Sequence, residues 1–169
     1  MDDVIAARAL HVLAVVVWIG GVSLVTTVAL PALRRGEFGP DRLQALRALE
    51  RRFAWQARIA VIVVGLTGLY MVWRLSLWDR FRTTAFWWMH AMVCLWLLFA
   101  VILFIGEPVI ARRRHRRAVA GPGGVSDGPS DGAVDRTFAW MQRAHWVLLV
   151  LSIVTVLGAV AGSHGWTIF

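Results

Sequence analysis

The sequence predicts an all-α membrane protein: a single domain (residues 1–169) folded as an antiparallel bundle of four transmembrane helices. Hydrophobic residues make up 59% of the 169 residues, which is typical of a membrane domain. Four apolar runs are each long enough to cross ~30 Å of hydrocarbon at 1.5 Å per residue. These runs cover residues of about 4–30, 53–77, 84–110 and 138–163.

The first run follows an acidic start, Met1-Asp2-Asp3, and no small-residue cleavage site comes after it. A secretory signal peptide has the opposite features, so we expect this helix to stay in the mature protein. The run ends at Pro31, which is followed by Arg34 and Arg35. Proline and charge at this point indicate the end of the hydrocarbon-spanning segment.

The connections between the later runs differ in kind. Residues 41–52 have helical spacing and charge pairs, which predicts an interfacial helix or an extension of the second helix. The short connection 78–82 requires the third helix to lie antiparallel beside the second. Residues 118–135, rich in Gly, Ser, Pro and Asp, predict a flexible cytoplasmic linker. Beyond a loose resemblance between the two helix pairs, the chain has no internal repeat.

Charge is distributed unevenly between the two sides of the predicted bundle. All eighteen basic residues are arginine; fourteen flank the first and third connections, and four lie on the other side. The positive-inside rule therefore predicts an inner-membrane protein with cytoplasmic first and third connections and periplasmic termini. We interpret the basic run 112–117 as a topology signal in contact with anionic lipid, and not as a nucleic-acid site.

Two histidines, His11 and His90, lie inside the first and third runs. Each is six or seven residues from the predicted outer boundary, a depth of roughly 9–10 Å at the helical rise. Ionisable groups at this depth mark a site. Paired imidazoles suit a haem b with two axial ligands, whereas a Cu(I) site depends on Cys and Met, and only Cys94, Met89 and Met92 are near.

Other residues on the same helix faces and at the outer rim complete the expected site. Trp18 and Trp87 share the faces of the histidines at helical spacing. Outer arginines match haem propionates, although they serve equally as interface anchors. Glycines on the second helix allow either close helix packing or room for a flat macrocycle. The predicted cofactor-binding residues are His11, His90, Arg8, Trp18, Gly68, Arg74 and Trp87.

A second polar group is predicted near the opposite, inner boundary. His145 lies about seven residues from that side, so it cannot share a centre with His11 and His90. The neighbouring polar residues form either a pocket for a quinone head group or an interhelical hydrogen-bond cluster. The predicted members of this inner group are Gln56, Arg58, Arg143 and His145.

Three motifs in order resemble a known superfamily: "LHVLAVVVWIGG" at 10–21, "LERRFA" at 49–54 with "GLTGLY" downstream, and "WWMHAM" at 87–92. The superfamily contains HemJ-type protoporphyrinogen oxidases and CopD-type copper-resistance membrane proteins. The resemblance implies that His11 and His90 match the histidines associated with haem b and activity in HemJ-type proteins. Met92 stands where those enzymes carry a lysine, and "QRAHW" replaces their "NE(V/I)P" element, which argues against protoporphyrinogen oxidation.

These observations together predict a haem b-binding cytochrome of the bacterial inner membrane, possessing oxidoreductase chemistry near the periplasmic face. Electrons are expected to pass to or from quinone, a periplasmic redox partner or a small molecule such as superoxide. The alternatives are a HemJ-like protoporphyrinogen oxidase and a CopD-like copper-handling membrane protein. The expected partners are the lipid bilayer and further copies of the chain in a homo-oligomer, with no nucleic acid.

Overall fold

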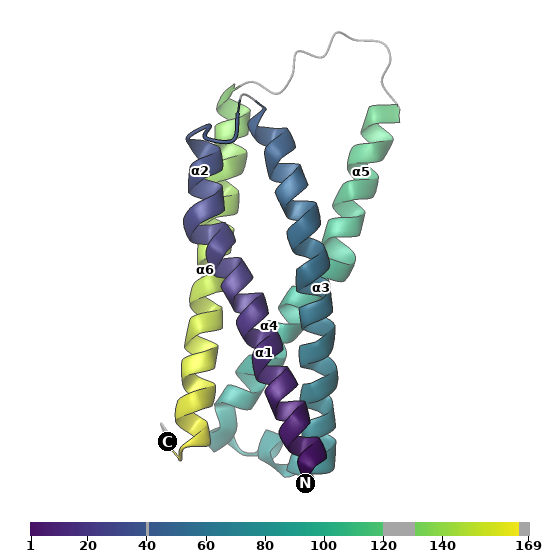
Figure 1. The fold of residues 1–169 in the computed structure, drawn as a ribbon, viewed down its shortest axis with the longest axis vertical. Coiled ribbons are helices and arrows are strands. Elements are labelled where there is room, and N and C mark those ends of the chain that lie inside the picture. The colour runs from purple at the N-terminus through teal and green to yellow at the C-terminus, as the bar shows by residue number, and fades with distance from the viewer. Residues whose placement is uncertain (40, 120–130, 166–169) are drawn as a thin grey trace.

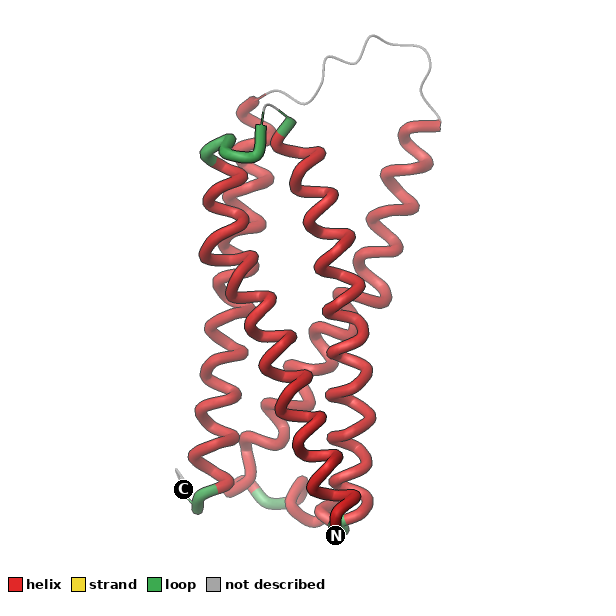
Figure 2. The backbone as a smooth tube through the Cα atoms, viewed as in Figure 1, coloured by secondary structure: helices red, strands yellow, loops and turns green. Residues whose placement is uncertain are grey.

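The computed structural model describes residues 1–39, 41–119 and 131–165, and in these residues the chain is helical with no β-strand. Four long helical rods, each able to cross a membrane, form the bundle (Figure 1), and a short loop joins the first two of them (Figure 2). The start of the first rod and the end of the last lie at the same end of the bundle, here called the terminal end. The other end, which carries Arg34, Arg35, Arg112 and Arg113, is called the arginine-rich end.

Irregular turns divide two of the four rods. The bounds in chain order are α1 (Asp2–Leu24), η1 (Val25–Ala29), α2 (Leu30–Arg34), α3 (Arg42–Arg74), η2 (Leu77–Arg82), η3 (Thr84–Phe86), α4 (Trp87–Val101), η4 (Ile102–Gly106), α5 (Glu107–Val119) and α6 (Asp131–Ser163). Each rod contains a stretch long and apolar enough to cross a membrane, so the prediction of a four-transmembrane-helix bundle is confirmed.

Two helices begin earlier than the apolar runs predict. α3 starts at Arg42, because the Asp41 carboxylate accepts a hydrogen bond from the Gln44 N–H at 2.9 Å and caps the helix. Residues 42–52 are therefore an extension of the second helix, with Asp41 as its N-cap. α6 starts at Asp131, where we expected linker, because Val134 and Phe138 are buried in the first turns. α5 likewise continues to Val119, and the rest of the predicted linker, 120–130, lies outside the described residues.

The core is organised around two helix pairs: α1 packs along α3, and α4 packs against α6. Trp18 of α1 meets Phe99 of α4 edge-on, with ring centroids 4.6 Å apart, and joins the pairs in the middle of the bundle. A second cluster closes the arginine-rich end. Its buried members are Val25, Leu30, Leu33, Leu46, Val134 and Phe138.

The first irregular turn, the π-helix η1, precedes Pro31. The N–H of Leu30 bonds to the carbonyl of Val25, five residues earlier. In that register the carbonyl of Thr26 would pair with residue 31, but proline has no N–H. Gln142 of α6 donates from Nε2 to this carbonyl at 2.7 Å. A side chain from another helix thus satisfies the backbone group that the proline leaves open.

The second irregular turn, η4, repeats this arrangement before Pro108. The N–H of Glu107 bonds to the carbonyl of Ile102, so the carbonyl of Leu103 would face the proline nitrogen. Arg58 of α3 donates from Nε to the Leu103 carbonyl at 3.2 Å. The same guanidinium pairs through Nη2 with the Glu107 carboxylate at 2.8 Å. Each helix pair thus supplies the hydrogen-bond donor that the other pair lacks at its proline.

Candidate functional site

His11 lies at the packed interface between α1 and α3. Its Nδ1 is 3.0 Å from Oγ1 of Thr67, and its side chain is half-buried. Gly68 faces the Cε1–Nδ1 edge of the ring, since a Cβ built there would be 3.3 Å from Cε1 of His11. The close approach of the two helices at this glycine therefore holds the imidazole against α3.

His90 lies near the start of α4 and has a different environment. Its Nε2 donates to the carbonyl of Phe81 at 3.0 Å, and the two rings meet edge-on with centroids 5.5 Å apart. The side chain is exposed and borders an open hollow of about 450 Å³. The hollow is lined by Phe81, Arg82, Thr83, Thr84, Trp87 and His90.

The two histidines share a half of the bundle but not a set of contacts. His11 bonds to Thr67 of α3, whereas His90 of α4 bonds to Phe81, and no hydrogen bond or ring contact found in the described part of the chain joins the two histidines. Nor do the described residues hold any group of three or more His, Cys, Asp or Glu side chains placed for a metal. Joint ligation of haem b by His11 and His90 stays a prediction.

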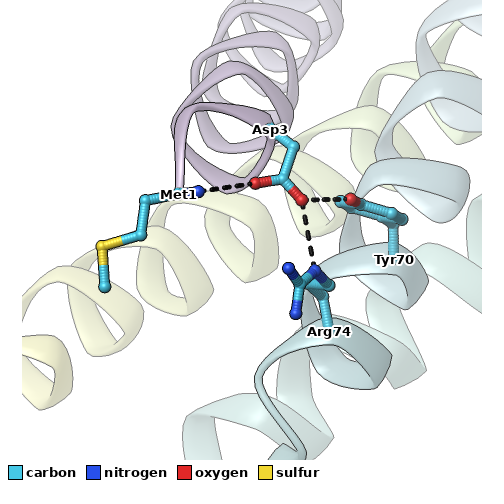
Figure 3. A network of polar contacts seen from close by, with 4 residues as sticks. All are labelled: Met1, Asp3, Tyr70 and Arg74. Atoms are coloured by element: carbon cyan, nitrogen blue, oxygen red, sulfur yellow. Dashed lines mark hydrogen bonds and ion pairs between the residues drawn. The ribbon is translucent and has the colours of Figure 1, made fainter.

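At the terminal end, Arg74 has a partner, Asp3, that was not among the expected site residues (Figure 3). The Asp3 carboxylate accepts from the Arg74 guanidinium at 3.2 Å and from the Tyr70 hydroxyl at 2.7 Å, and it lies 3.2 Å from the Met1 amine. This network fixes the start of α1 against the end of α3. Arg8, the other predicted rim arginine, is exposed. The sequence does carry a signal for this ion pair: Asp3 lies at the start of the first helix and Arg74 at the end of its antiparallel neighbour.

The remaining predicted outer residues are packing positions. Trp18 is 3% exposed within the central cluster, and its Nε1 has no acceptor among the described residues. Trp87 lines the hollow beside His90 with part of its surface. Its ring also lies over α6, where a Cβ at Gly158 would be 2.6 Å from Cη2 of the indole.

The predicted inner group is spread over separate contacts. His145 donates from Nδ1 to the carbonyl of Met141, one turn earlier in its own helix, at 2.9 Å. Arg58 is engaged by Leu103 and by Glu107, a partner that the sequence analysis missed. Gln56 and Arg143 are exposed. A quinone pocket at this level stays a prediction, and the Arg58 contacts match the interhelical hydrogen-bond alternative.

Three sulfur-containing residues lie near His90 in the sequence of α4: Met89, Met92 and Cys94. Cys94 follows His90 by one helical turn, and both side chains are exposed on the same outward face. Met89 is buried and Met92 is partly buried. Imidazole, thiol and thioether are the kinds of donor that copper ions prefer, although the buried Met89 does not share the outward face of His90 and Cys94.

Four hydrophobic rods with charged ends define the class, a multi-pass membrane protein. The family model described as copper resistance protein D matches residues 47–162, which is more than half of the chain. The chain therefore belongs to the copper resistance protein D family. No curated protein and no solved structure gives a significant match to it.

Proposed function

We propose that this protein handles copper ions at the membrane, with the ion as its cargo. Membership of the copper resistance protein D family carries the proposal. The chemistry of the terminal half of the bundle supports it, because His11, His90, Cys94 and the methionines of α4 offer nitrogen and sulfur donors. The CopD-like alternative of the sequence analysis thus replaces the cytochrome as the leading function.

Metal binding by the purified protein tests this proposal. The protein is isolated in detergent through a tag without histidine, loaded with Cu(I), and analysed for copper and iron by mass spectrometry. We expect at least one copper per chain. The variant with His11→Ala and His90→Ala is expected to lose more than half of it, because both outer imidazoles are gone.

His145→Ala is the matched control, since this imidazole bonds within α6 in the arginine-rich half and is expected to leave copper binding unchanged. In cells, expression is expected to change the copper tolerance of the host, and the double variant to abolish that change. Equal copper in the double variant and the unaltered protein would contradict the assignment of the donors.

The same preparation tests the haem b prediction. A reduced-minus-oxidised absorption spectrum shows the bands of a b-type haem if His11 and His90 bind one. Iron and porphyrin in stoichiometric amount, with no copper after loading, would reverse the order of the two functions. Electron transfer to quinone or superoxide depends on that result.

A further inference from the structure

The hydrogen bonds of Thr67 determine which nitrogen of His11 carries a proton. The Thr67 hydroxyl donates to the carbonyl of Val63, one turn earlier in α3, at 2.6 Å. A hydroxyl has a single proton, so in this arrangement Oγ1 of Thr67 acts as an acceptor toward the imidazole. The 3.0 Å contact to His11 is then a hydrogen bond donated by Nδ1–H. The lone pair of the neutral ring is consequently on Nε2.

Gly68 makes this arrangement possible. A Cβ at this position would be 3.3 Å from Cε1 and 3.6 Å from Nδ1 of His11. Such a contact is tight enough to move the ring and lengthen its bond to Thr67. The adjacent residues Thr67 and Gly68 therefore supply the acceptor and the space that the ring needs.

His90 presents the opposite nitrogen. Its Nε2 faces the carbonyl of Phe81, and a carbonyl only accepts, so Nε2 carries the proton and Nδ1 carries the lone pair. The two histidines are thus held in different tautomers by neighbours on different elements. In metal proteins a second hydrogen bond of this kind fixes both the tautomer and the orientation of a ligating imidazole.

We propose that Thr67 is a positioning residue that holds His11 as the Nδ1–H tautomer and so presents Nε2 as an electron-pair donor to a soft metal cation. The proposal rests on the proposed function for the identity of the cation, copper. Thr67 contacts Nδ1 and not Nε2, and its proposed role does not include binding the metal itself. The Thr67 hydroxyl fixes the tautomer of the imidazole, and the space at Gly68 allows the ring to keep the orientation in which this bond forms.

The test compares Thr67→Val, which removes the acceptor at nearly constant volume, with Thr67→Ser, which keeps it. The first readout is the ¹⁵N NMR spectrum of metal-free protein labelled at histidine, with the His11 signals assigned through His11→Gln. We expect a protonated Nδ1 and an unprotonated Nε2 in the unaltered protein. Thr67→Val is expected to redistribute the proton between the two nitrogens, and Thr67→Ser to restore the original pattern.

The second readout is Cu(I) affinity, measured by competition with a chromophoric chelator. Loss of an outer hydrogen bond to a ligating histidine costs about 10- to 100-fold in metal affinity, so we expect a loss of that size in Thr67→Val and recovery in Thr67→Ser. Gly68→Ala is expected to weaken binding as well, whereas Gly20→Ala, which has open space around it, is the control.

The two proposals fail in different ways. A Nδ1–H signal that changes in Thr67→Val, in a protein that binds no Cu(I), upholds the positioning role of Thr67 and overturns copper handling. Copper binding with the same affinity and the same ¹⁵N pattern in both variants upholds copper handling and overturns the positioning role.

Discussion

At the scale of single residues, tryptophans of one helix lie over glycines of the next. Gly65 of α3 faces Trp96 of α4, and a Cβ there would be 2.6 Å from Cζ2 of the indole. The Trp96 Nε1 donates to the carbonyl of Val61 at 2.8 Å, so the ring cannot move without breaking that bond. Small residues thus allow the helices to approach, and the indole fills the space they leave.

This contact predicts the effect of Gly65→Ala. Because the added methyl group displaces an anchored ring, we expect a loss of about 1–3 kcal/mol in the free energy of unfolding. Titration with SDS in mixed micelles measures it. Gly20→Ala is the matched control, since nothing lies within 4 Å of a Cβ there. It is expected to be neutral or stabilising by up to about 1 kcal/mol. Equal effects of the two substitutions would disprove the steric argument.

At the scale of elements, the lengths of the membrane-crossing segments followed from apolar runs, but the polar ends of the helices did not. Residues 42–52 and 131–137 extend their helices where composition predicts interface or linker. The Asp41 cap and the burial of Leu46 and Val134 stabilise these turns, and such contacts between distant segments leave no periodic signal in either one.

The π-helices show the same limit. Proline at positions 31 and 108 indicates that a backbone hydrogen bond is missing in each helix. Only the structure shows which distant side chain donates to the carbonyl that is left open. For the first turn that side chain is Gln142 and for the second it is Arg58. Because each side chain bonds to a carbonyl that its proline leaves open, we expect substitutions of the proline and of its partner to have non-additive effects on stability.

The coupling is measured by a double-mutant cycle on Pro31 and Gln142. Gln142→Leu leaves the Thr26 carbonyl without its donor and is expected to cost about 1–3 kcal/mol of unfolding free energy. In Pro31→Ala, residue 31 regains an N–H that bonds to this carbonyl, so Gln142→Leu is expected to cost less in that background. Additive effects of the two substitutions would contradict the role assigned to Gln142.

At the scale of the whole molecule, the depth of a residue in the bundle could be predicted from the sequence, but the neighbouring helix that its side chain faces could not. Counting residues from the helix ends placed His11 and His90 in the same half of the bundle. Which neighbour each one faces depends on the pairing of α1 with α3 and of α4 with α6. His11 consequently meets Thr67, whereas His90 turns outward to Phe81. Depth alone therefore identifies the two histidines as candidates but does not identify the residues to which they are hydrogen-bonded.

The orientation of the bundle in the membrane rests on its charge. Fourteen of the eighteen arginines flank the first and third connections, which predicts that the arginine-rich end is cytoplasmic and the terminal end periplasmic. Single cysteines introduced into a Cys94→Ser background test this, because Cys94 is the only native cysteine. Ser163→Cys reports on the terminal end and Phe38→Cys on the opposite end, and both positions are exposed.

In intact spheroplasts, a membrane-impermeant maleimide is expected to label Ser163→Cys and not Phe38→Cys. After lysis both are expected to react, which controls for the reactivity of the two thiols. The reverse pattern in spheroplasts would place the termini in the cytoplasm. The hollow beside His90, near the start of α4, would then also lie on the cytoplasmic side. In that case copper would reach His90 from within the cell. Orientation therefore determines the compartment from which the proposed cargo reaches His90.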